Sequence, residues 1–286
     1  MGGFSVLNNL ASLAAQQQSA ATQAQLQKTL LRMSSGTRIV TGGDDAAGLS
    51  IADGLQAQIR SLQQSVRNAN DGIGFLQTAD STLGQVTNLL NRAATLLTEA
   101  ATGTNSDSLE EISAELTQIY QEIDRVGLAT TFNGTKVFSG EEVNIFIGDT
   151  TNATTASAAT VSFTVNTLSV EELGLEEGVE EAGSEIKVTI EDAEDAQKML
   201  DEVANAISTV ATERGVLGAK MNRLENAVGI MQSQIQNLTA AESQIRDADM
   251  AEEIANMTKY QILSQVGLAS MAQANATTQS VLSLLR

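Results

Sequence analysis

The sequence predicts a mainly α protein, a long antiparallel helical coiled-coil rod with a small β-hairpin region in the middle of the chain. Three observations lead to this fold class: sustained heptad spacing of apolar residues, the absence of proline, and period-two alternation in the middle of the chain. Proline interrupts helices, and average usage of about 5% would give a chain of this length roughly 14 prolines. The absence of proline therefore fits long continuous helices.

The strongest heptad pattern lies between Ala52 and Ala101, where 13 of 15 positions on one stripe are apolar. The stripe runs through Ala52, Leu55, Ile59, Leu62, Val66, Ala69, Ile73, Leu76, Asp80, Leu83, Thr87, Leu90, Ala94, Leu97 and Ala101. Such a stripe indicates a coiled-coil seam. A 50-residue helix is about 75 Å long, whereas a compact globule of this chain would have a radius of gyration of only about 19 Å. We therefore expect a rod.

The helices that follow have similar stripes. Asp107 and Ser108 mark the start of a second helix, whose apolar line extends from Leu109 to Val126. A last long helix is expected to begin near Asp195. Its stripe has 11 apolar positions out of 13, namely Val203, Ile207, Val210, Arg214, Leu217, Met221, Leu224, Val228, Met231, Ile235, Leu238, Glu242 and Ile245. Near Asp247 the stripe shifts phase.

Both ends of the chain have weaker heptads with polar interruptions. The N-terminal line is Leu7, Leu10, Ala14, Ala21, Ala24 and Leu31, interrupted by Gln17 and Lys28. The C-terminal line is Met250, Ile254, Met257, Leu268, Met271, Leu282 and Leu285, interrupted by Gln261, Ser264, Asn275 and Thr278. The N-terminal segment is either a disordered tail or a segment that folds only when a partner covers it. The simplest fold is a hairpin of the whole chain that brings the two ends together.

The middle of the chain alternates with a period of two. Strands are predicted around residues 143–147, 161–165 and 186–190, as hairpins within about 134–192. Residues 171–195 hold 11 acidic residues and one lysine, and we interpret this run as a solvated face rather than a calcium site. The run lacks the ligand spacing of an EF-hand loop.

Composition excludes several functions. The chain has no Cys and no His, which removes thiolate and histidine nucleophile systems and nearly all zinc sites. No phosphate loop or dinucleotide fingerprint is present, so we expect neither an enzyme nor a bound cofactor. The net charge of −19 repels nucleic acid, and no apolar run approaches 18 residues, so neither nucleic acid nor a membrane is an expected partner. Residues 1–18 contain no Lys or Arg and do not resemble a cleavable signal peptide.

Several short motifs near the N-terminus occur in a recognisable order. They are Leu30–Ile39 (LLRMSSGTRI), Asp44–Leu49 (DDAAGL), Asn70–Ile73 (NDGI), Glu122–Val126 (EIDRV) and Phe132–Gly134 (FNG). The C-terminal motifs are Ile245–Glu253 (IRDADMAEE), Gln261–Leu263 (QIL), Ala272–Asn275 (AQAN) and Ser283–Arg286 (SLLR). Together they resemble the terminal signatures of bacterial flagellins over about 1–138 and 195–286. Val40–Gly43 departs from the family pattern, which is usually less flexible at this hinge.

The resemblance implies three parts. Residues 1–43 would form the N-terminal helix of an inner coiled-coil core domain, 247–286 its C-terminal helix, and 44–246 a rod domain with β-hairpins. It also implies a short flagellin without large outer domains that polymerises into a helical filament for swimming. The protein would be exported by the flagellar secretion apparatus without a cleaved signal peptide. Its partners would be other copies, the flagellar cap, hook–filament junction proteins and an export chaperone on the C-terminal segment.

The resemblance also places a receptor-binding surface on the rod. Arg92, Leu96 and Glu115 match the positions at which a vertebrate toll-like receptor contacts flagellins. Arg92 and Leu96 are four residues apart on one helical face, outside the seam line, and Leu96 is therefore expected to be exposed. The alternative is that these residues contact neighbouring subunits. Ala94 and Thr95 replace charged residues that are common in strongly recognised members.

Other interpretations remain open from the residues alone. Asn152–Thr154 fits an Asn-x-Thr sequon, which carries little meaning in a bacterial protein, and Ser and Thr between 149 and 169 could carry O-linked sugar as in some flagellins. A hook–filament junction protein of the same family is the nearest alternative function. A soluble coiled-coil scaffold is an alternative from another class.

Overall fold

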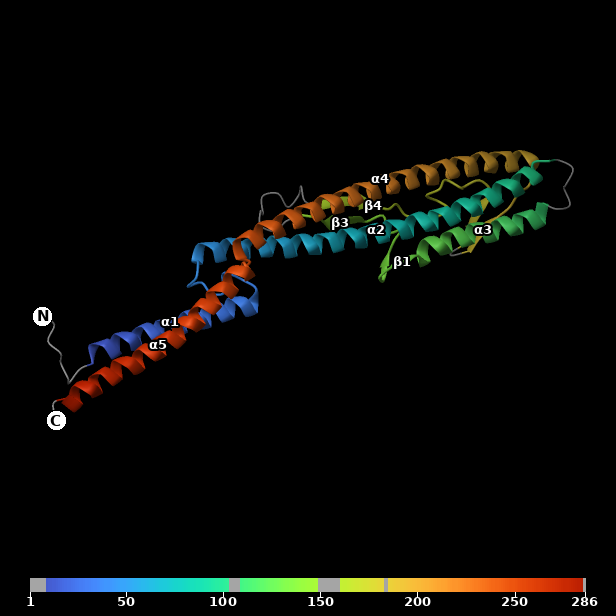
Figure 1. Ribbon diagram of the computed structural model, residues 1–286. Coiled ribbons are helices and arrows are strands. Elements are labelled where there is room, and N and C mark those ends of the chain that lie inside the picture. The colour runs from blue at the N-terminus through green and yellow to red at the C-terminus, as the bar shows by residue number, and fades with distance from the viewer. Residues whose placement is uncertain (1–8, 103–108, 149–159, 183–184, 285–286) are drawn as a thin grey trace. The chain divides into compact units, whose positions relative to one another are not determined.

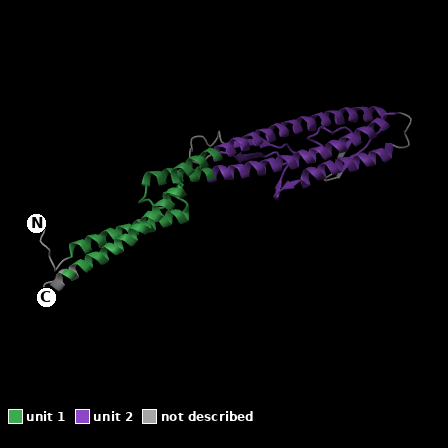
Figure 2. Ribbon diagram, in the orientation of Figure 1, with its two compact units in different colours: residues 1–59, 236–286 green, residues 60–235 purple. Residues whose placement is uncertain are grey.

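The computed structural model describes residues 9–102, 109–148, 160–182 and 185–284 (Figure 1). Within these ranges the chain forms five helices and six short strands, and the predicted mainly α class is confirmed. The chain divides into two compact units, residues 1–59 with 236–286 and residues 60–235, which Figure 2 colours green and purple. The expected residues Leu7, Asp107, Ser108, Asn152–Thr154 and Leu285 lie outside the described ranges.

The helices are long and continuous, as the absence of proline predicts. They are α1 (Leu10–Ser35), α2 (Ala46–Ala100), α3 (Leu109–Ala129), α4 (Ala193–Arg246) and α5 (Met250–Leu284). Asn9 caps α1 because its Oδ1 accepts the Ser12 N–H at 3.0 Å. Gly36 ends α1 with φ 71°, in the left-handed conformation that glycine adopts without strain. Asp45 accepts the Gly48 N–H at 2.9 Å at the start of α2.

Three two-stranded antiparallel pairs occupy the middle of the chain. They are β1 (Thr131–Phe132) with β2 (Thr135–Lys136), β3 (Glu142–Phe146) with β4 (Thr160–Thr164), and β5 (Val179–Ala182) with β6 (Glu185–Val188). The expected strands near 143–147, 161–165 and 186–190 are present. The sequence analysis missed β1, β2 and β5, because two-residue strands show no alternation and β5 lies inside the acidic run that we interpreted as solvated.

In the unit of residues 60–235, α2 and α4 run antiparallel. Leu224 of α4 lies near Gly72 of α2, while Arg214 bonds to Asp80, so positions rise along one helix as they fall along the other. The 13 positions of the α4 stripe are all buried or half-buried, as predicted. All 15 positions of the α2 stripe are likewise buried or half-buried: Leu62, Ala69, Leu76, Leu83, Leu90 and Leu97 are buried, whereas Val66, Ile73, Asp80, Thr87 and Ala94 are half-buried.

The α2 seam contains a second set of buried positions, mostly small residues, which we call the small half of the seam: Ser65, Gly72, Ala79, Val86, Ala93 and Ala100. These positions alternate with the leucine line, and the two sets together form one unbroken series of 12 buried residues at steps of three and four. The series is Leu62, Ser65, Ala69, Gly72, Leu76, Ala79, Leu83, Val86, Leu90, Ala93, Leu97 and Ala100. A Cβ at Gly72 would lie 3.0 Å from Ile145 of β3 and 3.4 Å from Leu224, so this position has little room for a side chain. Small residues therefore allow a strand and a second helix to approach α2 closely.

The helix α3 and the strands widen the buried face of α2 beyond that seam. Phe75 packs edge-on against Phe132 and at a tilt against Phe163, with ring centroids 5.9 Å apart in both pairs. Gly127 of α3 faces the Leu168 carbonyl, which would lie 2.1 Å from a Cβ. Hydroxyl groups of α3 accept backbone N–H groups of β6 and of the segment after it: Thr117 accepts the Val188 N–H, and Ser113 accepts the Ile190 N–H.

Replacing Ala79 by leucine tests the small half of the seam. Ala79 is fully buried, so the added bulk is expected to lower the free energy of unfolding by about 1–3 kcal/mol. The matched control is Gln77→Leu, two residues away at an exposed position. Urea unfolding followed by circular dichroism measures both variants, and equal stability of the two would show that Ala79 does not face a packed neighbour.

Candidate functional site

The unit of residues 1–59 and 236–286 contains a helix pair with an unusual seam. Helices α1 and α5 run antiparallel, since Asn9 donates to the Ala274 carbonyl at one end and Arg32 donates to Glu253 at the other. The α1 positions that turn inward are Ser12, Ala15, Ser19, Thr22, Leu26, Thr29 and Met33. Those of α5 are Glu253, Met257, Tyr260, Ser264, Gly267, Met271 and Ala274. Both series follow heptad steps, and most members are small or polar.

This arrangement corrects the predicted terminal seams. Leu10 is 71% exposed and Leu31 60%, while Met250 is 41% and Ile254 48% exposed. Of the predicted α5 line, Met257 and Met271 do turn inward, and Leu282 lies in α5 although its side chain is outside the described part. The prediction followed hydrophobicity. The α1–α5 contact instead follows size, because Gly267 opposite Ser19 lets the backbones approach and Thr22 can bond its hydroxyl to the Gln18 carbonyl at 2.9 Å.

Most large apolar side chains of this unit therefore point away from the seam. In the described part of the chain, 12 of the 15 large hydrophobic residues that are exposed belong to this unit. They are Leu10, Leu13, Leu30, Leu31, Val40, Ile51, Met250, Ile254, Ile262, Leu263, Val266 and Leu268. Residues 10–27 and 260–284 contain no charged side chain. An uncharged apolar surface of this kind indicates an interaction surface.

An ion network holds the turn between α1 and α2 against both helices of the pair. Asp44 bonds to Lys28 Nζ at 2.5 Å, lies 3.7 Å from Arg32 Nη2 and accepts the backbone N–H groups of Val40 and Thr41. Arg32 in turn reaches Glu253 Oε1 at 3.4 Å. The hydrogen bond from Lys28, followed by that from the Thr41 N–H, holds the pKa of the Asp44 carboxyl well below its usual range.

Backbone pairing fastens the same turn to the break between α4 and α5. Thr37 and Asp247 form an isolated antiparallel bridge, with the Arg38 N–H donating to the Arg246 carbonyl at 2.7 Å. The Ala248 N–H donates to the Gly36 carbonyl at 3.0 Å. The break between α4 and α5 falls where the apolar stripe shifts phase, and the bridge explains why both helical connections occur at one level within this unit.

In the other unit, the structure brings together two of the three predicted receptor residues. Arg92 Nη2 lies 2.7 Å from Glu115 Oε1, with both side chains about half exposed, and this pair connects α2 to α3. The expected exposure of Leu96 is wrong, because its exposed fraction is only 4%. Helix α3 covers this part of α2, so the buried face extends beyond the seam line to include position 96.

The sequence contained a signal for one ion pair that the analysis did not use. Asp80 and Arg214 each interrupt a mostly apolar stripe, and they carry opposite charges. In the structure Arg214 Nε donates to Asp80 Oδ1 at 2.8 Å, and Asp80 raises the pKa of Arg214. Opposite charges in two facing seams could thus have set the register of α2 and α4. Neither a metal-binding group of three or more acidic, His or Cys residues nor a helix able to cross a membrane occurs among the described residues.

Comparison with known proteins gives consistent results. The family model "Bacterial flagellin N-terminal helical region" matches residues 6–142, and "Bacterial flagellin C-terminal helical region" matches 200–285. The flagellar filament 33 kDa core protein of Treponema phagedenis is 37% identical over 98% of this chain and 99% of its own length. Flagellin of Bacillus subtilis is 36% identical over the same shares. The crystal structure of Bacillus cereus flagellin covers 62% of this chain and 94% of its own, with 26% identity and a TM-score of 0.47.

Long helices, a small or polar seam and an outward apolar surface define a structural protein that assembles with further copies. The chain belongs to the bacterial flagellin family. It is a structural subunit of the flagellar filament, an extracellular part of the flagellum, and it self-polymerises.

Replacing Asp44 by asparagine tests the ion network. Because the folded-state pKa of Asp44 is depressed, its contribution to stability is present above the unfolded value of about 3.9 and is lost as the pH falls through the folded value. We expect Asp44→Asn to melt below the natural protein at pH 7, and the gap to shrink below about pH 3.9. Asp71→Asn, at an exposed carboxylate with no ion pair among the described residues, is the control. Equal melting of Asp44→Asn and the natural protein at pH 7 would contradict a stabilising network.

Proposed function

We propose that the outward faces of α1 and α5 are the surfaces through which copies of this chain build the filament. The single observation that supports this most strongly is the reversal of polarity between the two sides of the pair: small and polar residues inside, large apolar residues outside. Leaving apolar surface in water is unfavourable by roughly 25 cal/mol per Å². Contacts between copies remove that cost, and the absence of charge lets chains of net charge −19 approach there without direct repulsion.

The packing of α1 against α5 supports the proposed domain division. We assign 1–43 and 247–286 to an inner core domain and 44–246 to a rod domain, because α1 and α5 pack against each other. A contact repeated head to tail that does not close on itself gives an open helical polymer. Such a filament, turned at its base, serves swimming motility.

The weak seam supports a proposed route of export. A helix pair with few apolar internal contacts can unfold for transit through a narrow channel, so the flagellar secretion apparatus is the proposed route, without a cleaved signal peptide. An export chaperone would cover the apolar face of α5, which includes Ile254, Ile262 and Val266, before assembly. The flagellar cap at the tip and the hook–filament junction proteins at the base would contact the same surfaces as a neighbouring copy.

The double variant Leu31→Gln with Ile254→Gln tests the outward surface. Both side chains are exposed in the single chain, so we expect the free energy of unfolding of the monomer to change by less than about 0.5 kcal/mol. Polymerisation, measured by sedimentation and electron microscopy, should fall sharply because two apolar contacts per subunit become polar. The control is Leu128→Gln, which replaces a 66% exposed leucine in the other unit. Normal filaments from the double variant would count against these surfaces.

A toll-like receptor contact at Arg92 and Glu115 is the second proposed interaction. Both side chains are accessible and hold each other in a defined geometry, and Arg is frequent among residues that dominate binding energy. Leu96 would act beneath this surface by supporting Arg92 rather than by direct contact, since it is buried. The alternative that Arg92 and Glu115 contact a neighbouring subunit is compatible with the same exposure.

Two substitutions separate direct contact from support. Arg92→Ala should weaken receptor binding by about tenfold or more with little change in melting, because it removes an exposed charge. Leu96→Ala should lower the free energy of unfolding by about 2–5 kcal/mol, because it leaves a cavity in a buried site. Binding to the purified receptor ectodomain and urea unfolding measure the two effects. Unaltered receptor binding of folded Arg92→Ala would remove the receptor assignment and leave the inter-subunit one.

The competing functions are distinguished by microscopy of concentrated protein. A filament subunit should give long tubes of uniform width. A soluble coiled-coil scaffold should give discrete particles, and a hook–filament junction protein should fail to extend beyond short assemblies. The near-complete coverage of filament core protein and flagellin relatives favours the filament subunit.

A further inference from the structure

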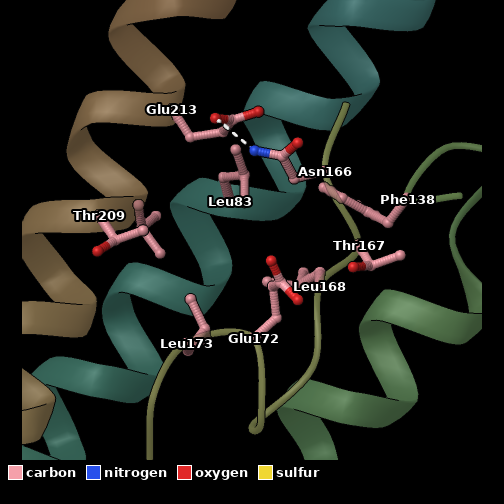
Figure 3. A pocket seen from close by; sticks show the side chains of 10 residues that line it. Leu83, Phe138, Asn166, Thr167, Leu168, Glu172, Leu173, Thr209 and Glu213 are labelled. Atoms are coloured by element: carbon pink, nitrogen blue, oxygen red, sulfur yellow. Dashed lines mark hydrogen bonds between the residues drawn. The ribbon is translucent and has the colours of Figure 1, made fainter. Parts of the chain in front are cut away.

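The unit of residues 60–235 contains a pocket with an apolar floor and a polar rim. Its floor is apolar and buried, with Leu83 of α2, Val210 of α4 and Phe138 each at most 6% exposed. Its rim is polar and accessible, with Asn166, Thr167, Glu172, Thr209 and Glu213 around the opening. Figure 3 shows the Glu172 side chain extending into the pocket from the segment after β4, with Glu213 at the α4 side.

The two rim carboxylates lack a cationic partner among the described residues. Glu213 accepts a hydrogen bond of 3.3 Å from the Asn166 amide, drawn in Figure 3, and Glu172 contributes no ion pair. The basic residue next to Glu213 in the sequence is already engaged, since Arg214 bonds to Asp80. The pocket thus combines an apolar floor with two carboxylates that can accept a cation.

The volume of the pocket indicates what kind of group can occupy it. Its volume is about 70 Å³, several times the roughly 10–15 Å³ that one water molecule needs. It is far smaller than the roughly 300–1,000 Å³ of pockets that hold small-molecule ligands. An aliphatic stem that ends in a positive charge fits this form, since Lys and Arg bury their methylene groups and keep the charged end at the surface.

We propose that this pocket receives a Lys or Arg side chain from a second copy of the chain in the filament. The inference rests on the proposed polymerisation, which presses copies together. Charge complementarity supports it, because an acidic rim on a chain of net charge −19 favours contact with a cationic side chain of another copy. The chain also offers suitable side chains, since Arg60, Lys136 and Arg223 are exposed and have no ion pair among the described residues.

The test removes the charge of the rim and compares it with the same change elsewhere. Glu172→Gln with Glu213→Gln alters the net charge by two units, and Glu171→Gln with Glu225→Gln does so at exposed positions outside this pocket. The critical concentration for polymerisation is measured by sedimentation at a fixed salt concentration. Loss of a close charge pair between copies should raise it by about tenfold or more in the pocket variant. The control variant should polymerise as well as the natural chain, or better, because general repulsion is reduced.

A second variant tests entry of the side chain. Thr209→Leu keeps both carboxylates and fills the mouth of the pocket, so it should also raise the critical concentration. Circular dichroism must show unchanged melting of each monomer, since the substituted side chains are at the rim. Polymerisation of both pocket variants at the concentration of the control overturns the inference and leaves the proposed function intact. Failure of the natural chain itself to form filaments would instead overturn the proposed function.

Discussion

The structure depends on how closely the backbones of its long helices approach one another. In the unit of residues 60–235, Gly72, Ala79 and Ala93 hold α2 near its neighbours, and leucines at the alternate positions fill the space that remains. In the other unit, Ser19 and Gly267 do the same for α1 and α5, without comparable leucines. Both seams therefore have close contacts, but only the first buries much apolar area within the single chain.

That difference explains how one chain can serve as both a folded subunit and a polymer. Hydrophobic stabilisation scales roughly with the apolar area removed from water. The unit of residues 60–235 obtains it internally from leucines such as Leu76 and Leu90, which are fully buried. The unit of residues 1–59 and 236–286 presents Leu31 and Ile254 to its surroundings, so its stability increases when another chain covers them. Its polar contacts include the Asp44 ion network and the bridge between Thr37 and Asp247.

These contacts also explain which features the sequence could predict. Periodicity located α2 and α4 because leucine and isoleucine stand out at heptad steps, and the change of phase near Asp247 coincides with the break between α4 and α5. It could not identify the small half of the α2 seam, since Ser65 or Gly72 in a helix has no hydrophobic signal. For the same reason it assigned Leu10 and Leu31 to the seam with α5, although that contact is made by Ser19 and Thr22. The exposure of Leu96 was wrong because the position of α3 beside α2 cannot be read from α2 alone.

Charged residues give the complementary information, and the pocket beside α4 shows how. A charge inside a seam is stable only with a partner, so Asp80 and Arg214 could have been matched from their interrupted stripes. Glu172 and Glu213 differ from this pair because they lie at a rim, where water solvates them in the single chain. Each can therefore remain without an ionic partner until another copy supplies one. The apolar floor at Leu83 and Val210 then distinguishes this place from an ordinary acidic surface, since water gains little there and a methylene stem gains contact. The outward apolar faces attract other copies without fixing how the copies align. The two rim carboxylates above a small pocket instead favour the alignment that brings a cationic side chain of a neighbouring copy to the pocket.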